Sequence, residues 1–301
     1  MFAPATKAAS KARIALCGPS GSGKTWTALA LATRLAARSS GRIAVIDTER
    51  GSASKYVGIN GWQFDTVTPD RFAPASLTEL LGVASGAGYD VTIVDSWSHY
   101  WSGTDGMQEQ ADRRAKSGNS FAGWKEVKPD ERRMVDAMVS YPGHLIVTMR
   151  SKTQYVIEQI ENNGRTKNVP RKIGLKPDQR EGIEYEFDLV GDLDLDNVLT
   201  VSKSRIPSLS RAVIPQPDAE LADAIADWLG EGEEVVPVGE YRTRALATGM
   251  SSTELRNLHA EVRNAGLLGA PVLDQNDQPT ALGDLIVACG HAAREREEKT
   301  P

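Results

Sequence analysis

The chain has 301 residues, enough for one α/β domain of roughly 200 to 230 residues and a smaller module. A hydrophobic fraction of 40% and a charged fraction of 25% are those of an ordinary globular protein and exclude a wholly disordered chain. The net charge of −5 provides no overall attraction to nucleic acid, so any contact with DNA must come from local basic patches.

The cysteines and the lack of a long apolar run indicate the compartment. Cys17 is expected to end a buried strand and Cys289 to lie in a distant helix, so a reducing compartment fits best. No apolar run approaches the roughly 18 residues of a membrane span, and the start, MFAPATKAASK, lacks the apolar stretch of a signal peptide. We therefore expect a cytoplasmic protein with no membrane partner.

Four short apolar runs alternate with helix-like stretches along the first half of the chain. They are ARIALC at 12–17, IAVID at 43–47, VTIVD at 91–95 and LIVTM at 145–149. Near-continuous apolar strands are typical of parallel sheets that are covered on both faces. We therefore expect an α/β core with a mostly parallel central sheet flanked by helices, which binds ligands at the carboxyl ends of its strands.

The pattern changes after the fourth run. YEFDLVGDLD at 185–194 and NVLTVSKSR at 197–205 alternate in polarity and are joined by a short polar turn, which predicts an antiparallel hairpin at the sheet edge. Residues 217–229 predict a helix, and residues 231–240, EGEEVVPVGE, an acidic linker.

We place the domain boundary at that linker. Residues 1–230 are then the core, 231–240 the linker, and 241–301 a small helical C-terminal domain. Ser251 and Glu254 have the spacing of a capping box, and a second helix is expected from about Thr280 to Glu297.

The strongest chemical signal is GPSGSGKT at 18–25, which matches G-x-x-x-x-G-K-[ST] between a predicted strand and a predicted helix. Its glycines let backbone N–H groups curl around phosphates, and the helix N-terminus adds a favourable dipole. Lys24 is expected to reach the β- and γ-phosphates and Thr25 to coordinate Mg²⁺, so ATP and Mg²⁺ are the expected ligands. The expected nucleotide-binding residues are Gly18, Pro19, Ser20, Gly21, Ser22, Gly23, Lys24, Thr25 and Trp26.

Two acidic residues are candidates for the metal and the base. Asp95 ends an apolar strand and is the natural acid for the magnesium shell. Ser96 follows it, so an acid pair cannot supply the base that orients the attacking water. Glu49, in IDTERGS at 46–52, lies at the expected nucleotide edge and is our candidate general base; a surface salt bridge with Arg50 or a helix cap is the alternative.

The segments IDTE and VTIVDS resemble the corresponding segments of RecA and RadA recombinases, whereas AAA+ ATPases would show an acid pair. The resemblance implies that Glu49 activates water and that Asp95 coordinates the metal. In the recombinases a polar residue, commonly glutamine, ends the sensor strand and reads the γ-phosphate. Arg150 stands there in this chain, with Lys152 nearby, which implies a cationic sensor or a different action.

The segment VSKSR at 201–205 is similar to the K-x-R element that related hexameric helicases and RadA-type ATPases insert into a neighbour's site. The resemblance implies that Lys203 and Arg205 act in trans within a homo-oligomeric ring or filament. Such charge neutralisation is worth about 10³ to 10⁵ in rate. The alternative is a basic edge strand that discourages sheet aggregation.

A further likeness is to phage RecA-like ATPases of the single-strand-annealing Sak type, over roughly residues 11–230. It is carried by MRSKTQY, KPDQREGIEYEFDLV and VSKSR. It implies binding and annealing of single-stranded DNA with DNA-stimulated ATP hydrolysis during phage recombination, in the cytoplasm of a bacterial host. The rival functions are a P-loop phosphotransferase such as a nucleotide kinase, and a nucleotide-gated DNA-binding module that hardly hydrolyses ATP.

Two polar segments, residues 99–130 and 151–182, are expected to be loops, with DNA contact and plain solvated or interprotomer loops as the alternatives. In the first, Trp101, Phe121 and Trp124 could stack bases for about 1 to 3 kcal/mol each, or pack down as core. In the second, seven basic residues stand against four acidic ones: Lys152, Arg165, Lys167, Arg171, Lys172, Lys176 and Arg180 against Glu158, Glu161, Asp178 and Glu181.

The histidines and the C-terminal helices add two further expectations. His99, His144, His259 and His291 show no metal-ligand spacing, so no metal site is assigned to the protein itself, and His99 is expected to be structural. The C-terminal helices could dock a partner such as a single-strand-binding protein, cap an oligomer, or merely stabilise the chain.

Overall fold

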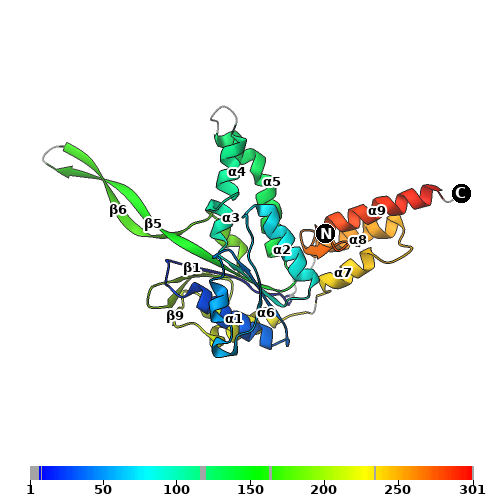
Figure 1. Ribbon diagram of the computed structural model, residues 1–301, viewed down its shortest axis with the longest axis horizontal. Helices are drawn as coiled ribbons and strands as arrows, with labels where there is room; N and C mark the ends of the chain where they lie inside the picture. The colour runs from blue at the N-terminus through cyan, green and yellow to red at the C-terminus, as the bar shows by residue number, and fades with distance from the viewer. Residues whose placement is uncertain (1–6, 8, 116–119, 163–164, 234, 300–301) are drawn as a thin grey trace.

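The computed structural model describes residue 7 and residues 9–115, 120–162, 165–233 and 235–299. Within these residues nine strands form one sheet with helices on both faces (Figure 1). Eight strands follow the order β3-β2-β4-β5-β1-β7-β8-β9, and β6 pairs with β5 outside this path. The strands are β1 (Arg13–Gly18), β2 (Ile43–Asp47), β3 (Asp65–Val67), β4 (Val91–Asp95), β5 (His144–Asn162), β6 (Arg165–Pro177), β7 (Leu189–Leu193), β8 (Val198–Ser204) and β9 (Val213–Pro215).

The predicted mostly parallel sheet is confirmed. The strands β3, β2, β4, β5, β1 and β7 pair in parallel along the path, β8 is antiparallel to β7, and β9 is antiparallel to β8. The predicted antiparallel hairpin is confirmed, since β8 pairs antiparallel with β7. It joins the sheet through β7, which pairs in parallel with β1 from Ile14 opposite Leu189 to Cys17 opposite Asp192. Most of β7 is buried, which suits an inner strand, so the antiparallel edge begins only with β8.

Two cores lie on opposite faces of the sheet. Along β1, Ile14 and Leu16 pack with α1 (Lys24–Ala37) and α6 (Ala219–Gly230). Ala15 and Cys17 face the other way, toward α2 (Pro74–Gly86) and α5 (Ser120–Val139). This alternation of faces gives three layers, as the near-continuous apolar strands predict.

The two segments that we expected as loops have regular structure. Residues 99–130 hold α3 (Ser98–Ser102), α4 (Met107–Arg114) and the first half of α5. Trp101 and Trp124 pack on each other with ring centroids 5.3 Å apart, whereas Phe121 is 79% exposed. The two tryptophans are partly buried, so Phe121 is the most exposed of the three aromatic residues, and their contact with DNA stays a prediction.

The strand β5 runs far beyond Met149, where we expected it to end. It pairs with β6 in antiparallel register from Ser151 opposite Pro177 to Asn162 opposite Arg165. The pair forms a long arm that projects from the body of the molecule at the carboxyl edge of the sheet (Figure 1, green). Residues 151–162 and 165–177 are thus the two strands of an arm instead of parts of a loop, and their pairing satisfies the backbone groups of a polar sequence.

The C-terminal part contains α7 (Val238–Ala245), α8 (Ser252–Asn264) and α9 (Leu282–Lys299), together with an unpredicted hairpin of β10 (Pro271–Leu273) and β11 (Pro279–Ala281). The capping box of Ser251 and Glu254 is present. The helix α7 begins inside the stretch that we expected to be a linker. These elements share a hydrophobic core of their own.

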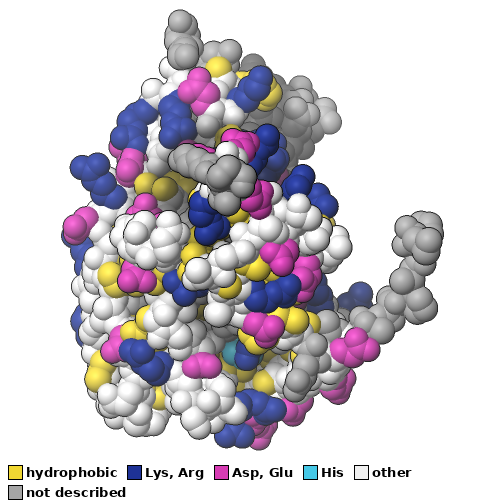
Figure 2. Space-filling model, turned by 90° about the vertical axis from the view of Figure 1, so that its right-hand side faces the viewer, with side chains coloured by type: hydrophobic (Ala, Val, Ile, Leu, Met, Phe, Trp, Pro, Cys, Tyr) yellow, Lys and Arg dark blue, Asp and Glu magenta, His cyan; other side chains and the backbone are white. Residues whose placement is uncertain are grey.

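The C-terminal part packs tightly on α2. A Cβ atom at Gly82 would lie 2.8 Å from the Pro279 Cβ, and one at Gly86 would lie 2.3 Å from the Leu273 Cδ1, so a larger residue at either position would force its neighbour to shift. Basic and acidic side chains are interspersed over this side of the molecule (Figure 2). Among the described helices, none is both long and apolar enough to span a bilayer.

Candidate nucleotide-binding site

The loop between β1 and α1 has the backbone of a phosphate cradle. Gly21 and Gly23 have φ values of 83° and 85°, in the left-handed region that favours glycine. The Lys24 ammonium donates to the Pro19 carbonyl at 2.7 Å, and burial lowers the pKa of Lys24 although nearby carboxylates oppose the shift. The loop thus has left-handed glycines of the kind that let backbone N–H groups surround an anion, with one partly desolvated cation beside it.

Thr25 and Asp95 meet at the carboxyl edge of the sheet. The Thr25 hydroxyl donates to Asp95 Oδ2 at 2.7 Å, and the Thr148 hydroxyl donates to Asp95 Oδ1 at 2.5 Å. Burial raises the pKa of Asp95, which is 2% exposed, while the two hydroxyls lower it. A hydroxyl beside a carboxylate is the oxygen-donor set that Mg²⁺ prefers. Thr148 was missed by sequence analysis because it is the fourth residue of an ordinary apolar run.

Two buried hydroxyls in the site lack a partner. Within the described part of the chain, Ser22 Oγ and Ser96 Oγ are buried and have no hydrogen-bond partner. Ser22 belongs to the loop, and Ser96 directly follows Asp95. A buried polar atom without a partner is costly, and a phosphate oxygen or a metal-bound water would satisfy it. The residues present therefore fit a magnesium-bound nucleotide, which Lys24, Thr25 and Asp95 would hold.

Glu49 is positioned by its neighbours on β2. The buried Asp47 carboxylate accepts from the Glu49 N–H at 2.8 Å and from the Ala53 N–H at 3.0 Å, and so fixes the turn after the strand. Thr48 is tied to β4, because its hydroxyl accepts from the Ser96 N–H at 2.7 Å. His99 Nδ1 lies 2.6 Å from the same hydroxyl, and a structural role for this histidine stays a prediction.

Arg150 grips Glu49. Arg150 Nε and Nη2 donate to the two carboxylate oxygens of Glu49 at 3.0 and 2.6 Å. Burial alone would raise the pKa of Glu49, but the hydrogen bonds and charge of Arg150 outweigh it and lower the pKa. The partner of Glu49 is thus Arg150, and not Arg50 as the alternative interpretation had it. Because β5 pairs Arg150 with Gly18 of β1, this ion pair stands beside the start of the loop.

The register of β8 separates Lys203 and Arg205 from the loop of their own chain. Lys203 pairs with Val190, near the amino end of β7, whereas the loop follows the carboxyl end of β1. The Arg205 guanidinium donates to the Asp188 carboxylate at 3.0 Å, and Lys203 donates to the Phe187 carbonyl. Neither side chain therefore joins the site of its own chain, so any action on a nucleotide would have to be in trans.

Trp26 follows Thr25 on α1 and is 38% exposed. Its ring meets those of Trp62 and Tyr56 edge to face, with centroids 4.7 and 6.0 Å away. The side chain thus belongs to a surface aromatic cluster beside the cradle, and nucleotide contact by Trp26 stays a prediction.

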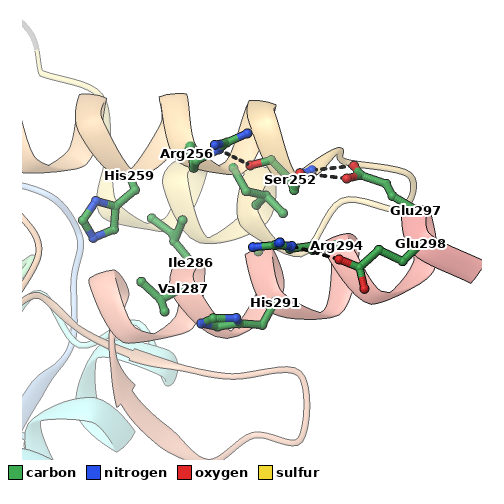
Figure 3. Close-up of a pocket in the computed structure, with 11 residues that line it drawn as sticks. Ser252, Arg256, His259, Ile286, Val287, His291, Arg294, Glu297 and Glu298 are labelled. Carbon is green, nitrogen blue, oxygen red and sulfur yellow. Dashed lines mark hydrogen bonds and ion pairs between the residues drawn. The ribbon is translucent and has the colours of Figure 1, made fainter.

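A groove of about 620 Å³ lies between α8 and α9, in the C-terminal part and away from the cradle. Figure 3 shows His259, Ile286 and Val287 toward one end and the ion pair of Arg294 and Glu298 toward the other, with His291 below Arg294. In the ranges that the structure describes, no group of three or more His, Cys, Asp or Glu side chains could hold a metal ion.

Comparison with known families supplies one match. A family model described as an AAA domain matches residues 10–212, more than half of the chain. That range includes the cradle, Glu49, Asp95, Arg150 and the β7–β8 hairpin, and it ends before α6. None of the curated proteins compared with the chain matches it. The match holds although Ser96 stands where we expected an AAA+ ATPase to carry a second acid.

Proposed function

The chain belongs to the AAA domain family, as an AAA-type P-loop NTPase, and on that premise we propose that it hydrolyses ATP with Mg²⁺ and acts on single-stranded DNA. The observation that carries the proposal is the continuity of β5 (Figure 1). One strand runs from the core sheet, through Arg150 in contact with Glu49, into the projecting arm. A change at the nucleotide would therefore reach the base of the arm through a single rigid element.

The site residues divide the hydrolysis step among them. Lys24 and the loop N–H groups bind the phosphates, and Thr25 and Asp95 supply oxygen atoms that would hold Mg²⁺. Mg²⁺, when bound, neutralises charge on the phosphates. Glu49 accepts a proton from the water that attacks the γ-phosphorus, the bond to the β–γ bridging oxygen breaks, and ADP leaves. Arg150 acts first as the partner of Glu49 and then as a cation for the γ-phosphate.

The base of the arm is tied to α3 close to the site. The buried Asp178 carboxylate, just after β6, accepts from the Ser102 hydroxyl at 2.7 Å and pairs with Lys152 at 2.8 Å. The Asp178 N–H donates to the Arg150 carbonyl at 2.6 Å. A shift of Arg150 toward a γ-phosphate would thus pull on both strands of the arm at their base.

Single-stranded DNA is the substrate that the sequence of the arm and the resemblance to Sak-type annealing ATPases support. Residues 151–182 carry a local excess of positive charge in a chain of net charge −5. The exposed Phe121 on α5 offers one side chain for base stacking. Within this proposal the protein anneals strands during phage recombination and acts as an oligomer in which Lys203 and Arg205 complete a neighbour's site.

The test measures phosphate release with a single-stranded oligonucleotide, with the matching duplex, and with nucleoside monophosphates. A variant that shortens the arm by joining Gln154 to Gly174 through a two-residue Asn-Gly turn tests the arm, because these residues face each other near its base. We expect single-stranded DNA to raise the turnover of the full chain and to leave the shortened variant at its basal rate.

Lys24→Ala is the control for contaminating activity. Stimulation by nucleoside monophosphates in place of DNA would support the phosphotransferase and overturn the proposal. Annealing that persists undiminished in Glu49→Gln would favour the nucleotide-gated binding module, because that module does not need hydrolysis.

A further inference from the structure

The turn between β7 and β8 is a rigid structure that ends beside the cradle. Asp194 Oδ1 accepts from the N–H groups of Asp196 and Val198, both at 2.9 Å. The Asn197 N–H donates to the Asp194 carbonyl at 3.2 Å, and the Gln216 N–H donates to the Asn197 carbonyl at 2.9 Å. Asn197 has a φ of 56°, a left-handed backbone that asparagine tolerates better than most residues.

The side chain of Asn197 reaches the loop that binds phosphate. Its Nδ2 donates to the Ser22 carbonyl at 3.0 Å and lies 3.4 Å from the hydroxyl of the buried Thr27. A carbonyl can only accept, so the amide nitrogen must be the atom that faces Ser22. Sequence analysis did not single out Asn197, because 175 residues separate it from Ser22 and only the pairing of β7 with β1 brings the two together.

The contact between Asn197 and the loop leaves no room for a side chain at position 23. A Cβ atom at Gly23 would lie 2.3 Å from Asn197 Nδ2, and Gly23 already needs glycine for its φ of 85°. The loop is therefore packed against the amide as well as shaped by its own glycines. The Ser22 carbonyl points toward Asn197, and the adjoining Gly23 N–H belongs to the same peptide plane and so points the opposite way.

We propose that Asn197 is a positioning residue of the nucleotide site: by holding the Ser22 carbonyl, its amide fixes the peptide plane whose N–H binds phosphate. Asn197 touches neither the substrate nor the metal, and it acts through the loop. The inference rests on the proposed nucleotide binding of the cradle, but on neither DNA nor hydrolysis.

Two variants separate this role from a merely structural one. Asn197→Gly keeps the left-handed backbone and removes the amide, and Asn197→Asp keeps the shape and replaces the donor with an acceptor. Leu195→Ala is the matched control, because Leu195 lies in the same turn and is 70% exposed. The measurement is the Kd for ADP with Mg²⁺ by titration calorimetry, with the melting temperature of each nucleotide-free variant recorded alongside.

A lost hydrogen bond to a buried acceptor weakens binding by roughly tenfold. We therefore expect the Kd for ADP to rise about 10-fold in Asn197→Gly and further in Asn197→Asp, where two oxygens repel each other, and to stay within twofold in Leu195→Ala. Under steady state the loss should fall on KM more than on kcat, since the loop holds the phosphates in the ground state and the transition state alike.

Three results would overturn the inference. If Asn197→Gly binds ADP as the wild type does, then the residue serves only the backbone of the turn. If both variants weaken binding only in step with a lower melting temperature, and Asn197→Asp is no worse than Asn197→Gly, then the effect is global. Failure of the wild type to bind ADP would overturn the nucleotide site itself and this inference with it, whereas binding without hydrolysis would leave the inference standing.

Discussion

Replacing Arg150 by alanine tests how the site is held before a nucleotide arrives. Two effects of the change oppose each other. The ion pair with Glu49 is broken, which frees the candidate base, and the cation that we assign to the γ-phosphate is lost. The Arg150 and Glu49 side chains are 49% and 27% exposed, so their ion pair is worth at most about 1 kcal/mol, and its release would raise the rate no more than about fivefold.

The loss of the cation is the larger effect. An arginine that stabilises the transferring phosphoryl group is worth about 10³ to 10⁵ in rate in related chemistry. Even at the lower end, this exceeds the gain from a freed base by two orders of magnitude. We therefore expect Arg150→Ala to lower kcat by at least about 100-fold. Arg150→Lys, which keeps the charge and loses the two-pronged contact, should lie between alanine and wild type.

The pH profile provides a second readout of the same change. Arg150 lowers the pKa of Glu49 against the opposing effect of burial, so its removal should raise that pKa above the wild-type value. A general base must be deprotonated, and the acid limb of kcat/KM should therefore move to higher pH in Arg150→Ala. A variant with wild-type kcat and an unmoved acid limb would refute both roles of Arg150.

Three further predictions concern other parts of the molecule. Burial lowers the pKa of His144 to about 3 from 6.5, so its contribution to stability is present above pH 6.5 and is lost as the pH falls toward 3. His144→Asn keeps an acceptor for the Ala12 N–H, and its unfolding free energy, measured in urea titrations, should fall less steeply below pH 6.5 than that of the wild type, by up to about 1.4 kcal/mol per pH unit. Equal slopes for the two proteins would contradict this. The valine side chain of Gly86→Val should collide with Leu273 and loosen the C-terminal part. We expect faster proteolysis near residues 231–237 and unchanged nucleotide affinity. An unchanged cleavage rate would refute this packing. Arg205→Ala should leave the Kd for nucleotide within twofold and lower turnover about 10³-fold, and full activity that is independent of protein concentration would exclude a trans role.

The centre of the sheet could be predicted from sequence because β1, β2 and β4 are buried along their whole length and are therefore mostly apolar. The arm could not be predicted in this way, since residues 151–177 are polar and lack a face that burial would mark. One signal was available: Asn163 and Gly164 form the dipeptide typical of two-residue hairpin turns, between runs that contain β-branched residues. That dipeptide itself lies outside the described residues.

The candidate site likewise contains residues that could be predicted from sequence and residues that could not. Lys24, Thr25 and Asp95 belong to local motifs, and the structure brings Thr25 and Asp95 into contact, although their roles stay predictions. The partners Thr148 and Asn197 have no local signal, because strand order alone places them beside Asp95 and the cradle. Contacts that depend on how distant strands pair cannot be predicted from the local pattern of residues.

The central claim is that Glu49 is the base of an ATP-hydrolysing site. Its most direct test is phosphate release by wild type and Glu49→Gln at saturating ATP, Mg²⁺ and single-stranded DNA, with ATP affinity measured for both proteins. General base catalysis is worth about 10² to 10⁴ in rate, so we expect Glu49→Gln to bind ATP as tightly as the wild type and to turn it over at least about 100 times more slowly. Turnover by Glu49→Gln at the wild-type rate would contradict the account.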